Sequence, residues 1–404
     1  MTPLNKLSLP AVNIFDPEFA KDPAGRSADA RRQSWIGKFP MGYVILDHQG
    51  MRDILSMDEQ FGTPHAQIAM MMGANGSPWG RWIQSMLGAT SGDQHRRLRN
   101  LVASTFTPKN ANVHRPMMRE VASGLLDEWA PKGRFDFAQF VSFFPISVMC
   151  RMIGAPQALV PHIKNHLETM GSGFDLNPSL VPAMDAAVTA MTGYVDDLLK
   201  QHRARSRTDG DTNDLLDDLI AAHEKGDRMS DQELYDMVIL LFGAGYDTSK
   251  NLLTMIVHQM CGRPDDWKRL ADEPGFAARV LEEGNRFANV TTSYRVAKVD
   301  VRYRDVVIPA GTFVAVPLPL SGHDPSKFAR PEVFDPDRKE RGGIGFGVGA
   351  HICLGQWIAR AQIEEGLPMM ARRLRNLRAD GPVEFRPFPG VWGLKTLPIA
   401  FDPA

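Results

Sequence analysis

The glycine-rich segment GFGVGAHICLGQ, residues 345–356, holds one of the three cysteines of the chain, Cys353, among four glycines. Cysteine acts as a nucleophile or a metal ligand only as the thiolate, which needs a metal, hydrogen-bond donors or a helix N-terminus beside it. The residues after Cys353 read as the start of a helix, so its sulfur is expected near free N–H groups. The preceding glycines permit a tight backbone and the close approach of a flat partner.

Several chemistries are open to a cysteine in this setting. A structural zinc site is disfavoured, because it needs four ligands and only His351 lies nearby in the sequence. A disulfide has no local partner. A catalytic Cys–His pair and a buried, inert cysteine both remain open on these residues alone.

A second chemical group lies inside a long predicted helix. Ser230 and Glu233 form a capping box before an apolar run that continues to about Cys261. The middle of this helix, LFGAGYDTS (residues 241–249), carries two glycines and a polar triplet. Glycine inside a helix is costly, so these residues indicate that something approaches the backbone there. A tolerated glycine at a helix crossing is the alternative.

Charged residues recur at helical spacing elsewhere in the chain. Glu283 and Arg286 are three apart and therefore share a helix face, as do His95 and Arg99, which are four apart. Taken alone, such pairs are usually exposed ion pairs or solvated faces.

The remaining elements indicate a mainly α fold with a small β region. Alternation over residues 299–318, with a Pro-Ala-Gly turn, predicts a small antiparallel sheet, and a weaker hairpin is expected near the C-terminus. The polar run at residues 205–214 predicts a loop. Pro368 falls in the helix after Cys353, which it should kink or break.

Composition limits the class of protein. The chain has 404 residues, 43% hydrophobic, with a net charge of −1. Global attraction to nucleic acid or to an anionic membrane is therefore not indicated. No apolar stretch is long enough for a membrane helix, and the few, widely spaced cysteines fit a reducing cytoplasm.

The spacing of four residues, Phe346, Gly349, Cys353 and Gly355, spells F-x-x-G-x-x-x-C-x-G. This motif resembles the haem-binding loop of the cytochrome P450 family. The resemblance implies the mainly α cytochrome P450 fold as a single domain over residues 1–404, with haem b as cofactor. It makes Cys353 the axial ligand of the haem iron, a thiolate that favours O–O cleavage.

The same resemblance assigns roles to other residues. Asp247 and Thr248 match the acid–alcohol pair of the family's central helix, which relays protons to bound dioxygen, and Ala244 leaves room for that dioxygen. Glu283, Arg286 and Arg338 match a buried network that supports the cysteine loop. The haem-binding set is His95, Arg99, Ala244, Arg295, Phe346, Gly349, His351, Cys353 and Gly355. The expected substrate pocket comprises Met86, Leu241, Ala244, Val290, Thr291 and Trp392.

The activity implied is monooxygenation of an apolar small molecule by dioxygen: hydroxylation, O-demethylation or epoxidation. Electrons are expected from a separate ferredoxin and ferredoxin reductase, as in soluble bacterial members of the family. Two alternatives are a peroxide-driven haem enzyme and a non-catalytic haem-binding sensor. Neither needs the Asp247–Thr248 pair.

Overall fold

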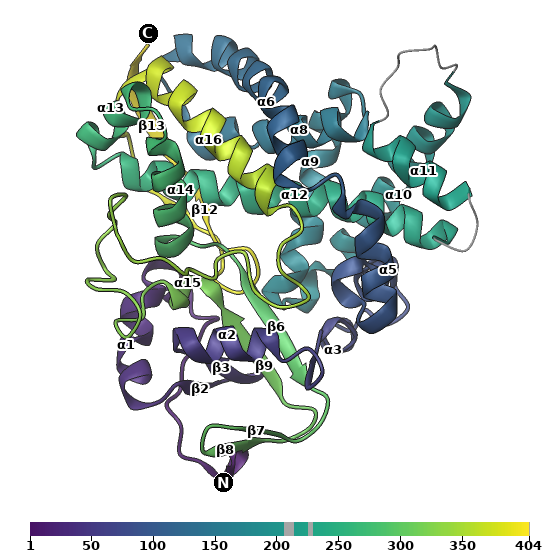
Figure 1. Cartoon of the computed structure of the whole chain (residues 1–404), viewed down its shortest axis with the longest axis vertical. Helices are drawn as coiled ribbons and strands as arrows, with labels where there is room; N and C mark the ends of the chain where they lie inside the picture. The colour runs from purple at the N-terminus through teal and green to yellow at the C-terminus, as the bar shows by residue number, and fades with distance from the viewer. Residues whose placement is uncertain (206–213, 225–228, 404) are drawn as a thin grey trace.

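The computed structural model describes residues 1–205, 214–224 and 229–403. Helices form most of the molecule, and the five-stranded sheet and the β1-β8-β7 sheet lie toward the end that holds the N-terminus (Figure 1). The predicted loop at 205–214 lies outside the described residues except for its two ends. The helices are α1 Pro23–Gln33, α2 His48–Ser56, α3 His65–Met71, α4 Pro78–Ser85, α5 Gly92–Ala103, α6 Pro108–Trp129, α7 Phe137–Val141, α8 Phe144–Ile153, α9 Val160–Gly171, α10 Val181–Ala204, α11 Leu215–Glu224, α12 Asp231–Met260, α13 Pro264–Asp272, α14 Phe276–Phe287, α15 Leu318–Ser321 and α16 Gln356–Arg373.

The strands in the described part of the chain form four small sheets. Their orders are β2-β3-β9-β6-β4, β1-β8-β7, β10-β13-β5 and β11-β12. The strands are β1 Thr2–Pro3, β2 Ile36–Phe39, β3 Gly42–Ile45, β4 Phe61–Gly62, β5 Arg134–Asp136, β6 Thr292–Ala297, β7 Val301–Tyr303, β8 Val306–Ile308, β9 Phe313–Pro317, β10 Leu374–Ala379, β11 Glu384–Phe385, β12 Leu394–Thr396 and β13 Pro398–Pro403.

The sheet predicted over residues 299–318 is divided between two sheets. β7 pairs with β8 as an antiparallel hairpin, but after the Pro-Ala-Gly turn β9 leaves them and lies between β3 and β6. All five residues of β9 are buried, so it serves as a central strand of the larger sheet. The hairpin expected near the C-terminus is present as β11 and β12.

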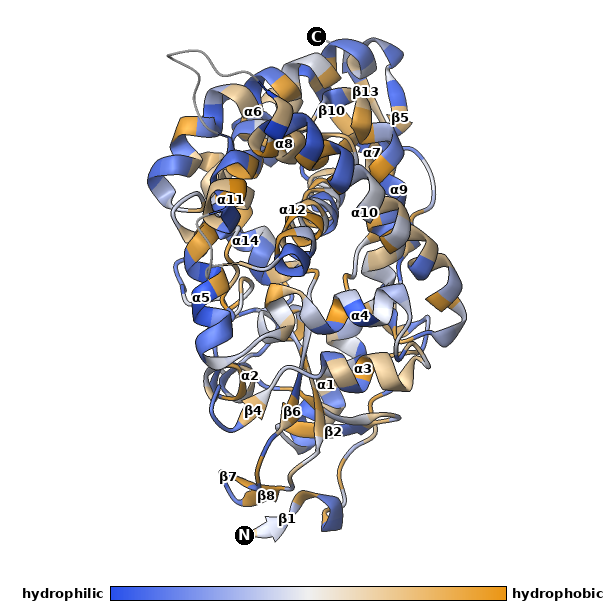
Figure 2. Cartoon of the chain, turned by 90° about the vertical axis from the view of Figure 1, so that its right-hand side faces the viewer, coloured by the Kyte–Doolittle hydropathy of each residue, from blue (hydrophilic) through white to orange (hydrophobic). Residues whose placement is uncertain are grey.

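The long central helix is confirmed as α12. Ser230 caps it, and Glu233 completes the capping box by accepting from the Ser230 N–H. Figure 2 looks nearly along this helix, which lies in the middle of the molecule with other helices around it. Because helices surround it, most of its side chains are buried.

The expected break at Pro368 is wrong. α16 runs unbroken from Gln356 to Arg373 with Pro368 inside it. It packs against α6, α13 and α14, and this tertiary packing outweighs the hydrogen bond lost at the proline.

A continuous hydrophobic core extends from Leu4 in the N-terminal region to Phe401 in β13. Among the described residues, no helix combines the length and apolar character needed to cross a membrane.

Candidate active site

The cysteine loop is closed by its own backbone. The Cys353 N–H donates to the Phe346 carbonyl at 2.8 Å, and Gly347 and Gly349 have positive φ angles of 74° and 79°. A Cβ atom at Gly349 would lie 2.5 Å from the Leu55 carbonyl oxygen, so only glycine fits there. The glycines therefore hold a tight loop against the end of α2.

The sulfur of Cys353 lies just before α16 and faces a cavity. Cys353 lines that cavity and is accessible at its surface. Burial raises the pKa of the thiol, whereas the Gly355 and Gln356 N–H groups and Arg99 act in the opposite direction. A metal ion at the sulfur would supply the further stabilisation that a thiolate needs.

The cavity has a volume of about 490 Å³ and lies between the cysteine loop, α12 and β6. Five of the six expected pocket residues line it: Met86, Leu241, Ala244, Val290 and Thr291. Trp392 does not, because its indole packs against Phe388 and Phe385 and its Nε1 donates to the Ala20 carbonyl at 3.0 Å. The preceding residue, Val391, lines the cavity in its place.

The acid–alcohol pair lines the same cavity as Cys353, but from α12. Thr248 Oγ1 donates to the Ala244 carbonyl at 2.9 Å, and both residues line the cavity. Asp247 is buried, and its Oδ1 accepts hydrogen bonds from Arg386 at 2.6 Å and Asn251 at 2.9 Å. Its Oδ2 has no hydrogen-bond partner among the described residues.

Four cationic or titratable residues gather at the cavity: His95, Arg99, Arg295 and His351. The rings of His95 and His351 are 4.3 Å apart, and burial together with the charge of His95 lowers the pKa of His351 to about 4. Arg99 donates to the Ile352 carbonyl at 2.8 Å. Burial also lowers the pKa of Arg295, which donates only to Ser293 and the Tyr294 carbonyl among described residues.

The three members of the predicted buried network lie in contact. Arg286 donates to Glu283 through Nε at 2.8 Å and Nη2 at 2.5 Å, and Arg338 Nε lies 3.3 Å from Glu283 Oε2. All three side chains are at most 5% exposed. Their remaining donors reach backbone carbonyls before the cysteine loop, which ties that segment to α14.

Sequence reasoning missed Arg386 and Asn289. Arg386 follows β11 and reaches Asp247 across the fold, a long-range contact without a local signal. Asn289 donates to Asn285 and to the Gly345 carbonyl, each at 2.8 Å, which links the end of α14 to the cysteine loop. The sequence does hold a signal for this link: Asn285 is a poor helix former within the E-x-x-R segment. It lies so close to Gly345 of the cysteine loop that a side chain at position 345 would not fit.

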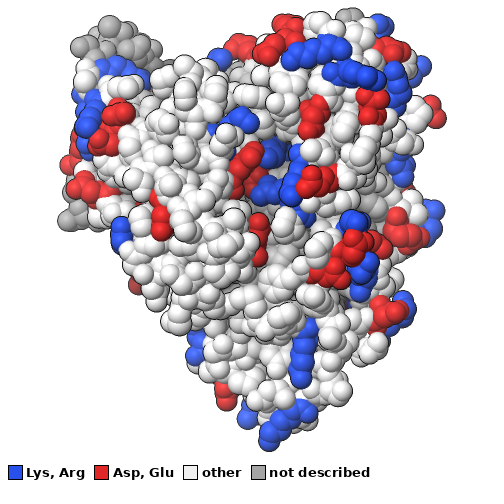
Figure 3. Space-filling view, turned by 180° about the vertical axis from the view of Figure 1, so that it is seen from behind, with Lys and Arg blue, Asp and Glu red and all other residues white. Residues whose placement is uncertain are grey.

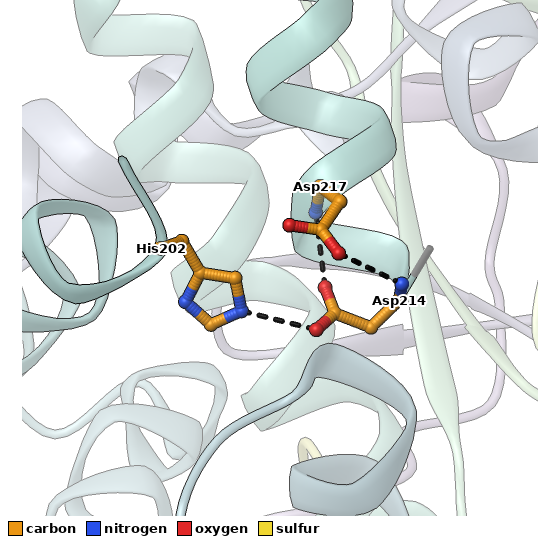
Figure 4. Close-up of side chains that lie close together, drawn as sticks. All are labelled: His202, Asp214 and Asp217. Carbon is orange, nitrogen blue, oxygen red and sulfur yellow. Dashed lines mark hydrogen bonds and ion pairs between the residues drawn. The ribbon is translucent and has the colours of Figure 1, made fainter. Parts of the chain in front are cut away.

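A histidine and two aspartates outside the cavity lie close enough together to hold a metal ion, but a neighbouring arginine argues against one. His202, Asp214 and Asp217 converge at the ends of α10 and α11, with His202 Nε2 3.1 Å from Asp214 Oδ2 (Figure 4). This hydrogen bond raises the pKa of His202. Arg205 lies 3.4 Å from the same carboxylate oxygen, so its positive charge disfavours a cation there. The cluster joins two helix ends.

The face in Figure 3 is hollowed near its middle, and acidic and basic side chains mingle around the hollow. An extended basic area is absent from this face among the described residues, in agreement with the small net charge of −1.

Comparisons with known proteins agree with this architecture. The sequence profile of the family "Cytochrome P450" matches residues 174–274 and 275–389. Luteothin monooxygenase of Streptomyces thioluteus is 29% identical over 98% of this chain and 97% of its own. Vitamin D(3) 25-hydroxylase of Pseudonocardia autotrophica is 32% identical over 76% of each chain.

The solved structure of epothilone B-bound cytochrome P450epoK superimposes with a TM-score of 0.88 at 22% identity, covering 97% of this chain and 100% of that one. The chain belongs to the cytochrome P450 family. It is accordingly a monooxygenase of the haem–thiolate class, with haem b as its cofactor.

The cavity fits this cofactor. Arg295 is buried and Arg99 is half-buried, and neither guanidinium group has a carboxylate within 4.0 Å in the described ranges. Buried cations are normally paired. Haem b carries two propionates, and these would supply the missing anions. The sulfur of Cys353 lines the same cavity as these cations.

Proposed function

We propose that the sulfur of Cys353 would hold the haem iron and that His95, Arg99, Arg295 and His351 would hold the propionates. The support is the glycine loop, which places Cys353 beside the Gly355 and Gln356 N–H groups in a cavity that Arg99 and Arg295 also line. Haem iron with a thiolate ligand supplies the electron transfer and oxygen chemistry of the reaction. The protein supplies the binding site, the protons and the exclusion of water.

Asp247 and Thr248 deliver protons from the α12 wall. Thr248 Oγ1 is anchored on the Ala244 carbonyl, so its lone pairs and the adjoining cavity are available to dioxygen and an ordered water. Asp247 binds Arg386 and Asn251 through Oδ1, which leaves Oδ2 as the oxygen able to accept and release a proton. This arrangement favours an oxygenase over a sensor or a peroxide-driven enzyme.

The substrate we propose is a mainly apolar molecule with at least one hydrogen-bond acceptor. Aliphatic side chains line much of the distal part of the cavity, among them Met86, Met237 and Leu241. Trp82 also lines it, and its buried Nε1, a donor only, has no acceptor among the described residues. A carbonyl, ether or hydroxyl oxygen on the substrate would satisfy this donor. Hydroxylation or epoxidation fits the printed activities of the relatives.

Electrons come from a separate ferredoxin-type donor in the cytoplasm. Its proposed docking area surrounds Trp357, which is 40% exposed on the first turn of α16, four residues after Cys353. The three cysteines form no disulfide, which fits a reducing compartment.

Replacing Thr248 by alanine tests the proton-relay assignment. The variant should consume reducing equivalents at a comparable rate but divert most of them to hydrogen peroxide, because the hydroxyl that positions the proton donor is gone. Product and peroxide are measured per NADPH oxidised, after a screen for compounds that shift the spin state. Thr189→Ala, on the exposed face of α10, is the control. Unchanged coupling in Thr248→Ala would remove Thr248 from the relay.

A further inference from the structure

We propose that Arg386 is the positioning residue for Asp247: it binds one carboxylate oxygen, Oδ1, and so fixes which oxygen faces the proton route. This inference rests on the proposed relay role of Asp247. The observation that carries it is the ion pair between Arg386 Nη1 and Asp247 Oδ1 at 2.6 Å, with side chains 12% and 5% exposed.

The pair is built by elements distant in the sequence. Arg386 lies beyond β11 in the C-terminal hairpin, and its backbone N–H donates to the Gly393 carbonyl at 2.9 Å. Gly393 in turn lies against Asn251 of α12, where a Cβ atom would be 2.3 Å from Asn251 Oδ1. The hairpin can therefore dock closely enough for Arg386 to reach α12 only because position 393 lacks a side chain.

A second glycine completes the enclosure from α9. A Cβ atom at Gly171 would stand 3.2 Å from Asp247 Oδ2, the oxygen without a hydrogen-bond partner among the described residues. Arg386 and Asn251 thus occupy one carboxylate oxygen, and the other is left in a narrow space beside the cavity. Loss of Arg386 would free the carboxylate to rotate and would remove its strongest contact.

Several other charged or titratable groups surround the pair. On α12, Lys250 Nζ lies 3.8 Å from Asp247 Oδ1 and 2.7 Å from Glu168 of α9, and the Tyr246 hydroxyl also contacts Glu168. Asp175, at the end of the short helix after α9, lies near enough to Arg386 for their charges to interact. Lys250 thus makes its shorter contact with Glu168, whereas Arg386 donates a hydrogen bond directly to Asp247.

Removing a cation from beside a buried carboxylate raises the pKa of that carboxylate. In Arg386→Gln, the acid limb of the pH profile for NADPH oxidation should move upward by about one unit or more. The holoenzyme is assayed with a surrogate ferredoxin and ferredoxin reductase, without added organic substrate, with peroxide release as the readout. Arg386→Lys keeps the positive charge, so the acid limb of its pH profile should lie close to that of the native protein.

Arg378→Gln is the matched control, because it removes an arginine from an exposed ion pair with Asp402. A profile for Arg386→Gln that coincides with that of Arg378→Gln overturns the inference. A merely structural role for Arg386 would lower the rate at every pH without moving the limb, and this outcome also overturns it.

A double-mutant cycle separates this inference from the proposed function. Thermal unfolding is compared for Arg386→Gln in the native chain and in an Asp247→Asn background. The loss of melting temperature should be several-fold smaller in the second background, since the charge that Arg386 serves is absent. If Asp247→Asn itself leaves turnover and coupling unchanged, the relay fails; if it impairs them while the cycle shows no coupling, only the role of Arg386 fails.

Discussion

At the scale of single residues, buried charge dominates the region behind the cysteine loop. Glu283 is the one carboxylate that contacts both Arg286 and Arg338 in this network. E-x-x-R is a common sequence pattern and usually forms an exposed ion pair. Here the ion pair is buried, so the loss of one partner should strongly destabilise the protein. The sequence indicates the three partners only through the family resemblance, because Arg338 lies more than fifty residues beyond Glu283.

Glu283→Gln should destabilise the protein by about 3–5 kcal/mol, since two buried guanidinium groups lose their shared counter-charge. Glu282→Gln, which removes the neighbouring, partly exposed carboxylate that pairs with Arg360, should cost less than about 1 kcal/mol. Chemical denaturation monitored by tryptophan fluorescence compares the two variants. Equal losses would show that the buried network contributes no more than a surface ion pair.

Asp175 makes stability depend on pH in the direction opposite to that of most carboxylates. Burial raises its pKa to about 7, although Arg386 acts to lower it. The folded state therefore binds more protons than the unfolded state between about pH 4 and pH 7, and stability falls as pH rises through that window.

Asp175→Asn removes this penalty, so its melting temperature should exceed the native value by about 2 °C or more at pH 8, with a smaller difference at pH 5. Differential scanning calorimetry at the two pH values checks this. A difference that is the same at both pH values would contradict the raised pKa of Asp175.

At the scale of elements, the sequence predicts α12 well and the sheets poorly. The capping box and apolar period of α12 are local signals, and the helix begins and ends where they indicate. The partners of β9 lie far away in the chain and are chosen by burial in the larger sheet. Trp392 illustrates the same difficulty, because a hydrophobic residue beside the cavity and one in the core have the same sequence signature.

Gly284 shows how packing explains a weak helix former within α14. A Cβ atom there would lie 2.4 Å from Ile256 Cγ1, so α14 approaches α12 more closely than any other residue would permit. Gly284→Ala should therefore cost about 1–3 kcal/mol despite its better helix propensity.

Gly124→Ala is the control, since Gly124 is exposed in α6 with open space around its Cα. It should stabilise the protein by about 0.5–1 kcal/mol. Opposite signs for the two variants in the same denaturation experiment are expected. A neutral or stabilising Gly284→Ala would mean that the α12–α14 contact adjusts without cost.

At the scale of the whole molecule, the cavity separates a proximal wall, the cysteine loop with α16, from a distal wall made by α12. The net charge of −1 does not indicate a basic surface overall, and it does not predict these two walls, which depend on contacts between distant segments. The proximal surface near Trp357 is the proposed docking area for the electron donor.

Trp357→Ala should weaken binding of a ferredoxin donor about tenfold, as expected for the loss of a central aromatic contact. Val113→Ala, at an exposed apolar residue of α6, should leave it unchanged. For both variants, the ferredoxin concentration that gives the half-maximal rate of haem reduction is measured. A substrate-induced spin-state shift of normal size in each variant shows that the substrate cavity is intact. Equal behaviour of the two variants would place the docking area elsewhere.

The most direct test of the account is the absorption spectrum of the reduced holoprotein with carbon monoxide, recorded for the native chain and for Cys353→His. The native protein should show the strongly red-shifted Soret band of a thiolate-ligated haem, and the variant should bind haem without that band. A native spectrum that lacks the red-shifted band, or a Cys353→His variant that retains it, would contradict the assignment of Cys353 as the ligand on which the whole site is built.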